Sequence, residues 1–123
     1  MNREVLRHCQ QGLPGWGGLN PGDFDFSPPK GFSTFTMGVK AKQSITPPAV
    51  LYRRLAGKEN AILDARTERA VFLALSKAGI APECYLYADS FRLEQFYEGR
   101  TLTADEVFDP PTLRGVAAEL YRF

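Results

Sequence analysis

Five short stretches of the chain have the pattern of strands that bury one face, with hydrophobic and polar residues mostly in alternation. They are Phe24–Phe26, Phe35–Lys40, Ala49–Leu55, Glu83–Ala88 and Phe91–Tyr97. A long stretch of helical periodicity separates the third from the fourth. We therefore predict an α+β fold, in which a five-stranded antiparallel sheet has one main helix inserted after strand 3.

Three helices are predicted within and around this sheet. The main helix starts near Asn60, a suitable N-cap, and continues to Ala78, where Gly79 stops it. A short amino-terminal helix covers Asn2–Gln11, and a last helix covers Leu113–Phe123. These two outer helices flank the sheet.

Glu68 falls within the apolar stripe of the main helix. At 100° per residue, the positions within about 80° of it are mostly apolar, whereas most basic residues of this helix lie on the other side. The positions near Glu68 are Ala61, Asp64, Ala65, Val71, Phe72, Leu75 and Ala78. A buried carboxylate is costly unless a cation meets it, and the preceding strand contains Arg53 and Arg54. A strand cation paired with a helix carboxylate is how a kinase amino-terminal lobe holds the phosphates of ATP.

The composition narrows the classes of function. The chain has 123 residues, the length of one domain, and its 15 Lys+Arg against 14 Asp+Glu give a net charge of +1. This balance argues against a nucleic-acid partner. Cys9 and Cys84 fit no metal-ligand spacing and no disulfide framework, and no run is long and apolar enough to cross a membrane. We expect a cytoplasmic protein without membrane insertion, and a solvated His8 in its polar helix.

Several blocks of residues, in this order and spacing, match a known family. They are Leu13–Trp16, Gly31–Thr34, Val50–Gly57, Asp64 with Glu68 and Phe72–Leu75, Ser76–Gly79 with Pro82 and Tyr85, and Glu94–Phe96 with Gly99 and Arg100. On these blocks the chain resembles the amino-terminal lobe of choline and ethanolamine kinases, which have a protein-kinase-like fold. The resemblance extends over nearly the whole chain.

The resemblance implies a set of residues that bind ATP. Arg54, three residues before Gly57, is similar to the arginine that holds the nucleotide phosphates, with Arg53 as the runner-up. Glu68 matches the helix carboxylate that orients this arginine. Ser33 and Thr34 match the small polar pair of the family's phosphate loop.

Two further features complete the implied nucleotide site. Gly31 keeps the phosphate loop close to its ligand, although Lys30 stands where the family usually has a second glycine. Gln95, Phe96 and Tyr97 resemble the hinge between the two lobes. There the adenine edge bonds to backbone groups, for which we expect Gln95 and Tyr97.

The resemblance assigns no catalytic residue and no metal ligand to this chain. In the family, the catalytic aspartate, the ligands of Mg²⁺ and the choline pocket belong to the carboxy-terminal lobe. Residues 1–123 are therefore expected to be one amino-terminal lobe that is inactive by itself, with ATP as its ligand and Mg²⁺ held elsewhere. Choline or ethanolamine would bind only with the other lobe, and residues 98–123 would begin the connection to it.

Two other functions stay open at this point. One is a non-catalytic α+β module for binding or dimerisation, and the other is a lobe of an aminoglycoside-phosphotransferase-like kinase. The blocks Leu13–Trp16 and Glu98–Arg100 argue against the latter. As an isolated lobe, the chain would leave Leu120, Tyr121 and Phe123 without a predicted cover, and such a patch favours self-association.

Overall fold

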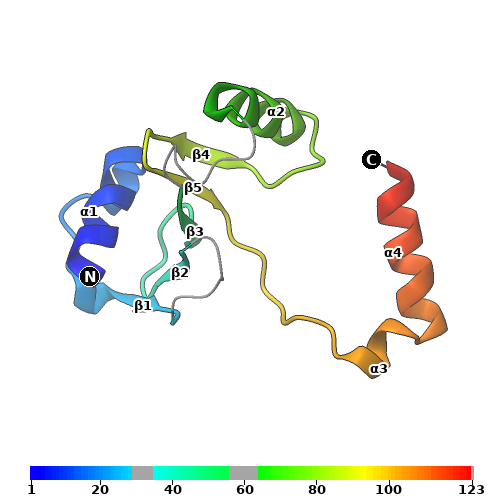
Figure 1. Cartoon of the computed structure of the whole chain (residues 1–123). Coiled ribbons are helices and arrows are strands. Elements are labelled where there is room, and N and C mark those ends of the chain that lie inside the picture. The colour runs from blue at the N-terminus through cyan, green and yellow to red at the C-terminus, as the bar shows by residue number, and fades with distance from the viewer. Residues whose placement is uncertain (29–34, 56–63, 123) are drawn as a thin grey trace.

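The structure is a computed structural model that describes residues 1–28, 35–55 and 64–122 (Figure 1). Two short 3₁₀ turns, Pro14–Trp16 and Pro21–Asp23, connect the first helix to the first strand. The helices are α1 (Asn2–Gly12), α2 (Ala65–Lys77), α3 (Ala104–Val107) and α4 (Pro110–Arg122). The strands are β1 (Phe24–Phe26), β2 (Thr36–Ala41), β3 (Ala49–Arg54), β4 (Cys84–Tyr87) and β5 (Phe91–Gln95).

The five strands form one sheet in the order β1-β2-β3-β5-β4, and every neighbouring pair is antiparallel. The predicted five-stranded antiparallel sheet and the α+β class are thus confirmed, and α2 follows β3 along the chain. The last helix begins at Pro110, earlier than predicted, because proline is well suited to a first helical turn. The predicted N-cap Asn60 lies outside the described residues.

One face of the sheet forms the hydrophobic core. Alternation along β3 turns Val50 and Tyr52 to this face, where they are 0% and 1% exposed. α1 covers the face with an apolar side (Figure 1). The buried core residues are Val5, Leu6, Cys9, Leu13, Trp16, Phe24, Met37, Val39, Val50, Tyr52, Phe91 and Leu93.

Trp16 closes one end of this core. Its ring is fully buried with its centroid 4.6 Å from that of Phe24. Its indole Nε1 donates a hydrogen bond of 2.9 Å to the carbonyl of Pro47, so the one polar atom of the ring is satisfied. This contact fixes the loop between β2 and β3 against the turn that follows α1.

α2 lies over β4 (Figure 1). The rings of Phe72 and Tyr87 have centroids 6.0 Å apart, and the backbone N–H of Cys84 donates to Ser76 Oγ at 3.1 Å. The half-buried residues of α2 are Phe72, Leu75 and Ser76, all in its second half. The contacts of α2 with the sheet are thus made mainly by its carboxy-terminal half.

An extended segment leads from β5 away from the sheet to α3 and α4 (Figure 1). α3 is a single turn capped by Thr103 and Glu106, whose side chains bond reciprocally to each other's backbone N–H. α4 has no buried residue among those described. In the part of the chain that the structure covers, no helix is long and apolar enough to cross a bilayer.

The burial of the two cysteines can be tested by thiol labelling. Burial raises the pKa of Cys9 to about 12, and it also raises the pKa of the half-buried Cys84. Because the thiolate is the reactive form, the shift from 9.0 lowers the reactivity of Cys9 at pH 8 by about a thousandfold. In the folded Cys84→Ser variant, Cys9 should not react with Ellman's reagent until guanidinium unfolds the protein. Rapid labelling of this native variant would contradict the buried position of Cys9.

Candidate functional site

The second face of the sheet, which α2 approaches from the β4 edge, carries charged side chains. Alternation turns Arg53 of β3 to this face, and Arg92 of β5 is its cross-strand partner. Glu94 follows Arg92 two residues later and therefore lies on the same face. With an exposed fraction of 2%, Glu94 is the one buried polar or charged residue among the described residues.

Glu94 is held by both arginines. Arg53 Nε donates a hydrogen bond of 2.8 Å to Glu94 Oε2, and Arg92 Nε donates to the same oxygen. The side chains of Arg53 and Arg92 are 29% and 12% exposed, so the arginine of β3 is the more accessible of the two. Two cations and one carboxylate leave the cluster with a formal charge of +1, which favours an anionic ligand.

Arg92 also connects this cluster to α2. Its guanidinium carbon lies 3.8 Å from the ring centroid of Phe72 and 5.7 Å from that of Tyr87. The guanidinium of Arg69 lies 5.3 Å from the same Tyr87 ring. These cation–π contacts, together with the Phe72–Tyr87 ring contact, hold α2 on the face where Arg53 lies.

Arg54, the arginine expected to hold phosphates, lies on the other face of β3. Its guanidinium is 4.6 Å from the ring centroid of Phe35, at the edge of the hydrophobic core. Burial raises the pKa of Tyr52, and a hydrogen bond from Arg54 opposes this rise. The described contacts of Arg54 are therefore made with core residues of the α1 side.

His8 belongs to the same group of core contacts. Its Nδ1 is 2.9 Å from the Tyr52 hydroxyl, and its ring stacks on Phe91 with centroids 4.4 Å apart and planes at 8°. The expectation of a solvated His8 is met only in part, because α1 packs this half-buried side chain against the sheet. The sequence pattern of α1 is mostly polar and does not indicate this contact.

The expected burial of Glu68 is also wrong. Glu68 is exposed in the first turn of α2, and no described residue forms an ion pair with it. The phase of the predicted stripe is nevertheless right, since Phe72 and Leu75 face the sheet and are half-buried. Glu68 lies one turn before Phe72 on the same side of the helix, but the contacts of α2 with the sheet begin at Arg69.

The expected phosphate-loop residues Gly31, Ser33 and Thr34 lie outside the described residues. Of the two expected hinge residues, Gln95 uses its backbone N–H to donate to the carbonyl of Glu83 at 2.8 Å. The backbone N–H of Tyr97 has no acceptor in the described part of the chain, and the Tyr97 side chain is 64% exposed. Among the described residues, the backbone donor of Tyr97 is thus unpaired, whereas the donor of Gln95 is paired with Glu83.

A small apolar surface lies on the same face of the sheet as the cationic cluster, since Gly38 pairs with Leu51 and Leu51 pairs with Glu94. A Cβ atom at Gly38 of β2 would lie 2.6 Å from Phe96 Cε2, so glycine is what lets the Phe96 ring lie against this strand. Lys40 lies 5.1 Å from the centroid of the same ring and forms an ion pair with Glu98. A flat ring surface near a cationic cluster suits a ligand that joins an aromatic base to phosphates. No group of metal-ligating side chains is present among the described residues.

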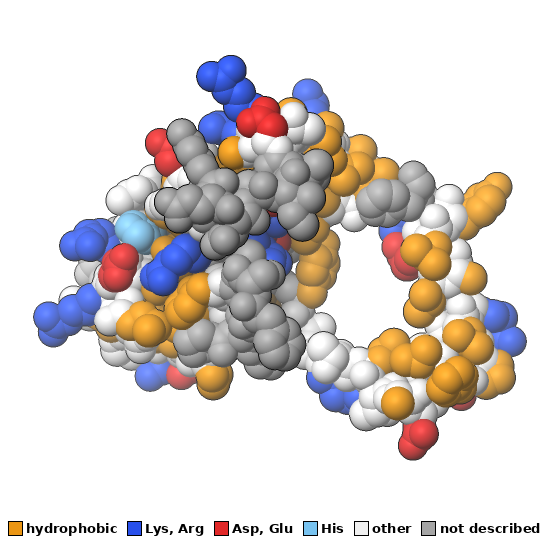
Figure 2. Space-filling view, in the orientation of Figure 1, with side chains coloured by type: hydrophobic (Ala, Val, Ile, Leu, Met, Phe, Trp, Pro, Cys, Tyr) orange, Lys and Arg blue, Asp and Glu red, His pale blue; other side chains and the backbone are white. Residues whose placement is uncertain are grey.

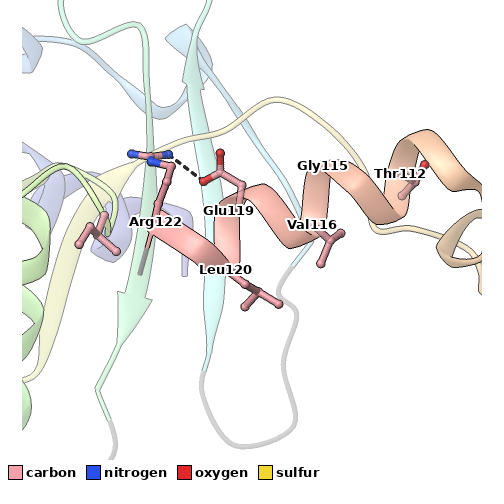
Figure 3. Close-up of a pocket in the computed structure, with 7 residues that line it drawn as sticks. Thr112, Gly115, Val116, Glu119, Leu120 and Arg122 are labelled. Carbon is pink, nitrogen blue, oxygen red and sulfur yellow. Dashed lines mark hydrogen bonds and ion pairs between the residues drawn. The ribbon is translucent and has the colours of Figure 1, made fainter.

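A separate groove of about 700 Å³ lies along α4 (Figure 3). It is lined by Ile80, Thr112, Gly115, Val116, Glu119, Leu120 and Arg122. Arg122 donates to the carbonyl of Gly79 at 3.4 Å and pairs with Glu119 at 2.7 Å. None of the lining residues belongs to the Arg53 cluster, and the walls of the groove are mostly apolar.

Comparisons with known proteins identify relatives of this chain. The family model described as choline/ethanolamine kinase matches residues 30–123. A solved choline kinase from Cryptosporidium parvum is similar in fold, with a TM-score of 0.72 and 23% identity over 87% of this chain. An ethanolamine kinase from Plasmodium vivax has a TM-score of 0.66 and 21% identity over 97% of this chain. In both cases the chain spans 30% of the solved protein. A comparison with curated proteins found no match.

The contact between Gly38 and Phe96 gives a prediction about stability. Gly38→Ala should destabilise the protein by about 1–3 kcal/mol, because the added methyl group overlaps the Phe96 ring. Replacing the ring as well, in Gly38→Ala with Phe96→Leu, should cost less than the two single changes combined. Urea unfolding of the four proteins measures this coupling, and strictly additive effects would show that the ring does not lie against β2.

Proposed function

The chain belongs to the choline/ethanolamine kinase family, and from this premise we propose that it is the ATP-binding lobe of such a kinase. The complete enzyme would transfer the γ-phosphate of ATP to the hydroxyl of choline or ethanolamine, a step of phospholipid head-group synthesis. The observation that supports this most is the cationic cluster of Arg53, Arg92 and Glu94 on the face that α2 approaches. An accessible strand arginine on this face is suited to bind phosphates.

We assign the phosphate contact to Arg53 in preference to Arg54. The two side chains lie on opposite faces of β3, and α2 approaches the face of Arg53. The expected role of Glu68, in the first turn of α2, as a second carboxylate near the phosphate arginine stays a proposal, since Glu68 is exposed and no described residue forms an ion pair with it. Gly31, Ser33 and Thr34 would supply the loop over the phosphates.

The adenine would bind at the hinge that follows β5. The backbone of Gln95 and Tyr97 is proposed to meet its edge, with the N–H of Tyr97 as donor, because the N–H of Gln95 already bonds to Glu83. Gly38 and Phe96 would form part of the apolar surface beside the base. In this proposal, the aromatic base and the phosphate chain of ATP would lie along a single face of the sheet.

The chemistry proposed for this lobe is to bind and position ATP. Phosphoryl transfer depends on aligning the nucleophile with the γ-phosphate and on neutralising the charge of the phosphates. Arg53 contributes the second of these. The base that activates the acceptor hydroxyl is proposed to lie outside residues 1–123. The ligands of Mg²⁺, an ion that would help to neutralise the phosphate charge, are proposed to lie there as well. These residues alone would bind ATP without transferring phosphate, and residues 98–123 would connect the two lobes.

A second candidate function is a dimerisation module. α4 has exposed apolar side chains in Leu113, Val116, Leu120 and Tyr121, with exposed fractions of 45%, 44%, 70% and 94%. Figure 2 shows hydrophobic side chains gathered along this part of the molecule. Burying such a surface against a second copy would remove apolar area from water. This apolar surface is compatible with ATP binding on the sheet.

The cytoplasmic location stays a prediction.

The assignment of Arg53 can be tested by titrating the chain with ATP. Arg53→Ala should weaken ATP binding by about tenfold or more, because it removes charge-assisted hydrogen bonds to the phosphates. The matched change Arg54→Ala should alter the affinity for ATP by less than about twofold, because Arg54 makes no proposed hydrogen bond to the phosphates. Calorimetry measures both. The reverse order of the two effects would restore Arg54 as the phosphate ligand, and no binding by the unchanged chain would overturn the proposed nucleotide lobe.

Self-association through α4 can be tested by light scattering after size exclusion. We expect dimers or larger species at high protein concentration, and Leu120→Glu should shift the chain to monomers because it charges the exposed apolar patch. Val71→Glu, at a 52% exposed position of α2, is the matched control and should leave the oligomers intact. A clean monomer at high concentration in the unchanged chain would contradict the prediction.

A further inference from the structure

We propose that Glu94 is a positioning residue that orients the guanidinium of Arg53 toward the nucleotide phosphates. This inference rests on the proposed function, because it assumes that Arg53 contacts a phosphate. Glu94 lies on the same sheet face as Arg53 and is 2% exposed, so its carboxylate cannot itself be a ligand for a molecule in solvent. Its described partners are Arg53 and Arg92.

The hydrogen bond between the two side chains selects one orientation of the arginine. Arg53 donates to Glu94 through Nε, the donor nearest its own chain, at 2.8 Å. Within the described residues its two Nη groups have no acceptor. The planar guanidinium is thus fixed at its base, and no described residue pairs with the donors at its tip, which we assign to a phosphate.

Arg92 fixes Glu94 in turn. Its Nε donates to the oxygen that also receives Arg53, and its guanidinium packs on the ring of Phe72 at 3.8 Å. Because Arg92 is 12% exposed and packed on α2, it is a structural donor, whereas Arg53 at 29% is the accessible one. Successive contacts therefore connect α2 to Arg92, Arg92 to Glu94, and Glu94 to Arg53, which would contact the proposed ligand.

The sign of one substitution distinguishes positioning from a simple effect of charge. If Glu94 acted as a nearby negative charge alone, Glu94→Gln would raise the affinity for an anion, since the cluster would change from +1 to +2. If Glu94 orients Arg53, the same change weakens the Nε contact, frees the guanidinium to rotate and lowers the affinity. The two effects have opposite directions.

The experiment titrates the chain with ATP, inorganic triphosphate and adenosine. Glu94→Gln should weaken the binding of ATP and of triphosphate by about tenfold. It should leave the binding of adenosine unchanged, because adenosine has no phosphate. Glu119→Gln removes one charge from exposed α4 and should change none of the three. In an Arg53→Gln background, Glu94→Gln should have no further effect on ATP, since Glu94 acts through Arg53. Loss of all three ligands in equal proportion would show a merely structural role and overturn the proposal.

The outcomes separate this inference from the function on which it rests. An unchanged chain that binds neither ATP nor adenosine overturns the nucleotide lobe and the inference together. An unchanged chain that binds ATP, with a Glu94→Gln variant that binds it equally or more tightly, overturns the role of Glu94 alone. If Glu94→Gln does not fold, the Nε–Hε signal of Arg53 is followed by NMR in the unchanged chain. It should stay protected from exchange while ATP binds, and loss of this protection would overturn the proposal.

Discussion

A buried carboxylate between two arginines is the interaction on which the candidate site depends. Glu94 has an exposed fraction of 2%, and a charge in such a position is stable when hydrogen-bonded cations surround it. Arg53 comes from β3, whereas Arg92 and Glu94 come from β5, so the cluster joins two neighbouring strands. Through Phe72 it also reaches α2. The pairing of β3 with β5, the position of α2 and the orientation of Arg53 are therefore linked through contacts with Glu94 and Arg92.

Much of the fold follows from the sequence because the signals involved are local. Alternation and turn residues predict five strands, and the structure has them within one or two residues of the predicted ends. Phe72 and Leu75 face the sheet at the phase that the helical period predicts. Such patterns depend on neighbours along the chain, and a single sequence contains all of them.

The candidate site is less predictable because it depends on how elements meet. Helical period alone places Glu68 in an apolar stripe, but the depth of its burial depends on how far α2 overlaps the sheet. The same period-two rule that places Arg53 and Arg54 on opposite faces of β3 does not say which face α2 covers. Alternation does place Arg92 and Glu94 together on one face of β5. Alternation does not identify Arg53 as the cross-strand partner of Arg92, because this partnership depends on the pairing of β3 with β5.

The way in which α2 is attached has a mechanical consequence. Its carboxy-terminal half is fixed by the hydrogen bond from the backbone N–H of Cys84 to Ser76 Oγ and by the ring of Phe72, while the residues of its first turn are exposed. The helix is thus anchored from Phe72 to Ser76, and its first turn extends beyond this anchored part. Glu68 lies four positions before Phe72 (72 minus 68), or about 6 Å at a rise of 1.5 Å per residue. A tilt of about 20° about Phe72 would move the Glu68 backbone by about 2 Å, enough to make or break an ion pair of hydrogen-bond length.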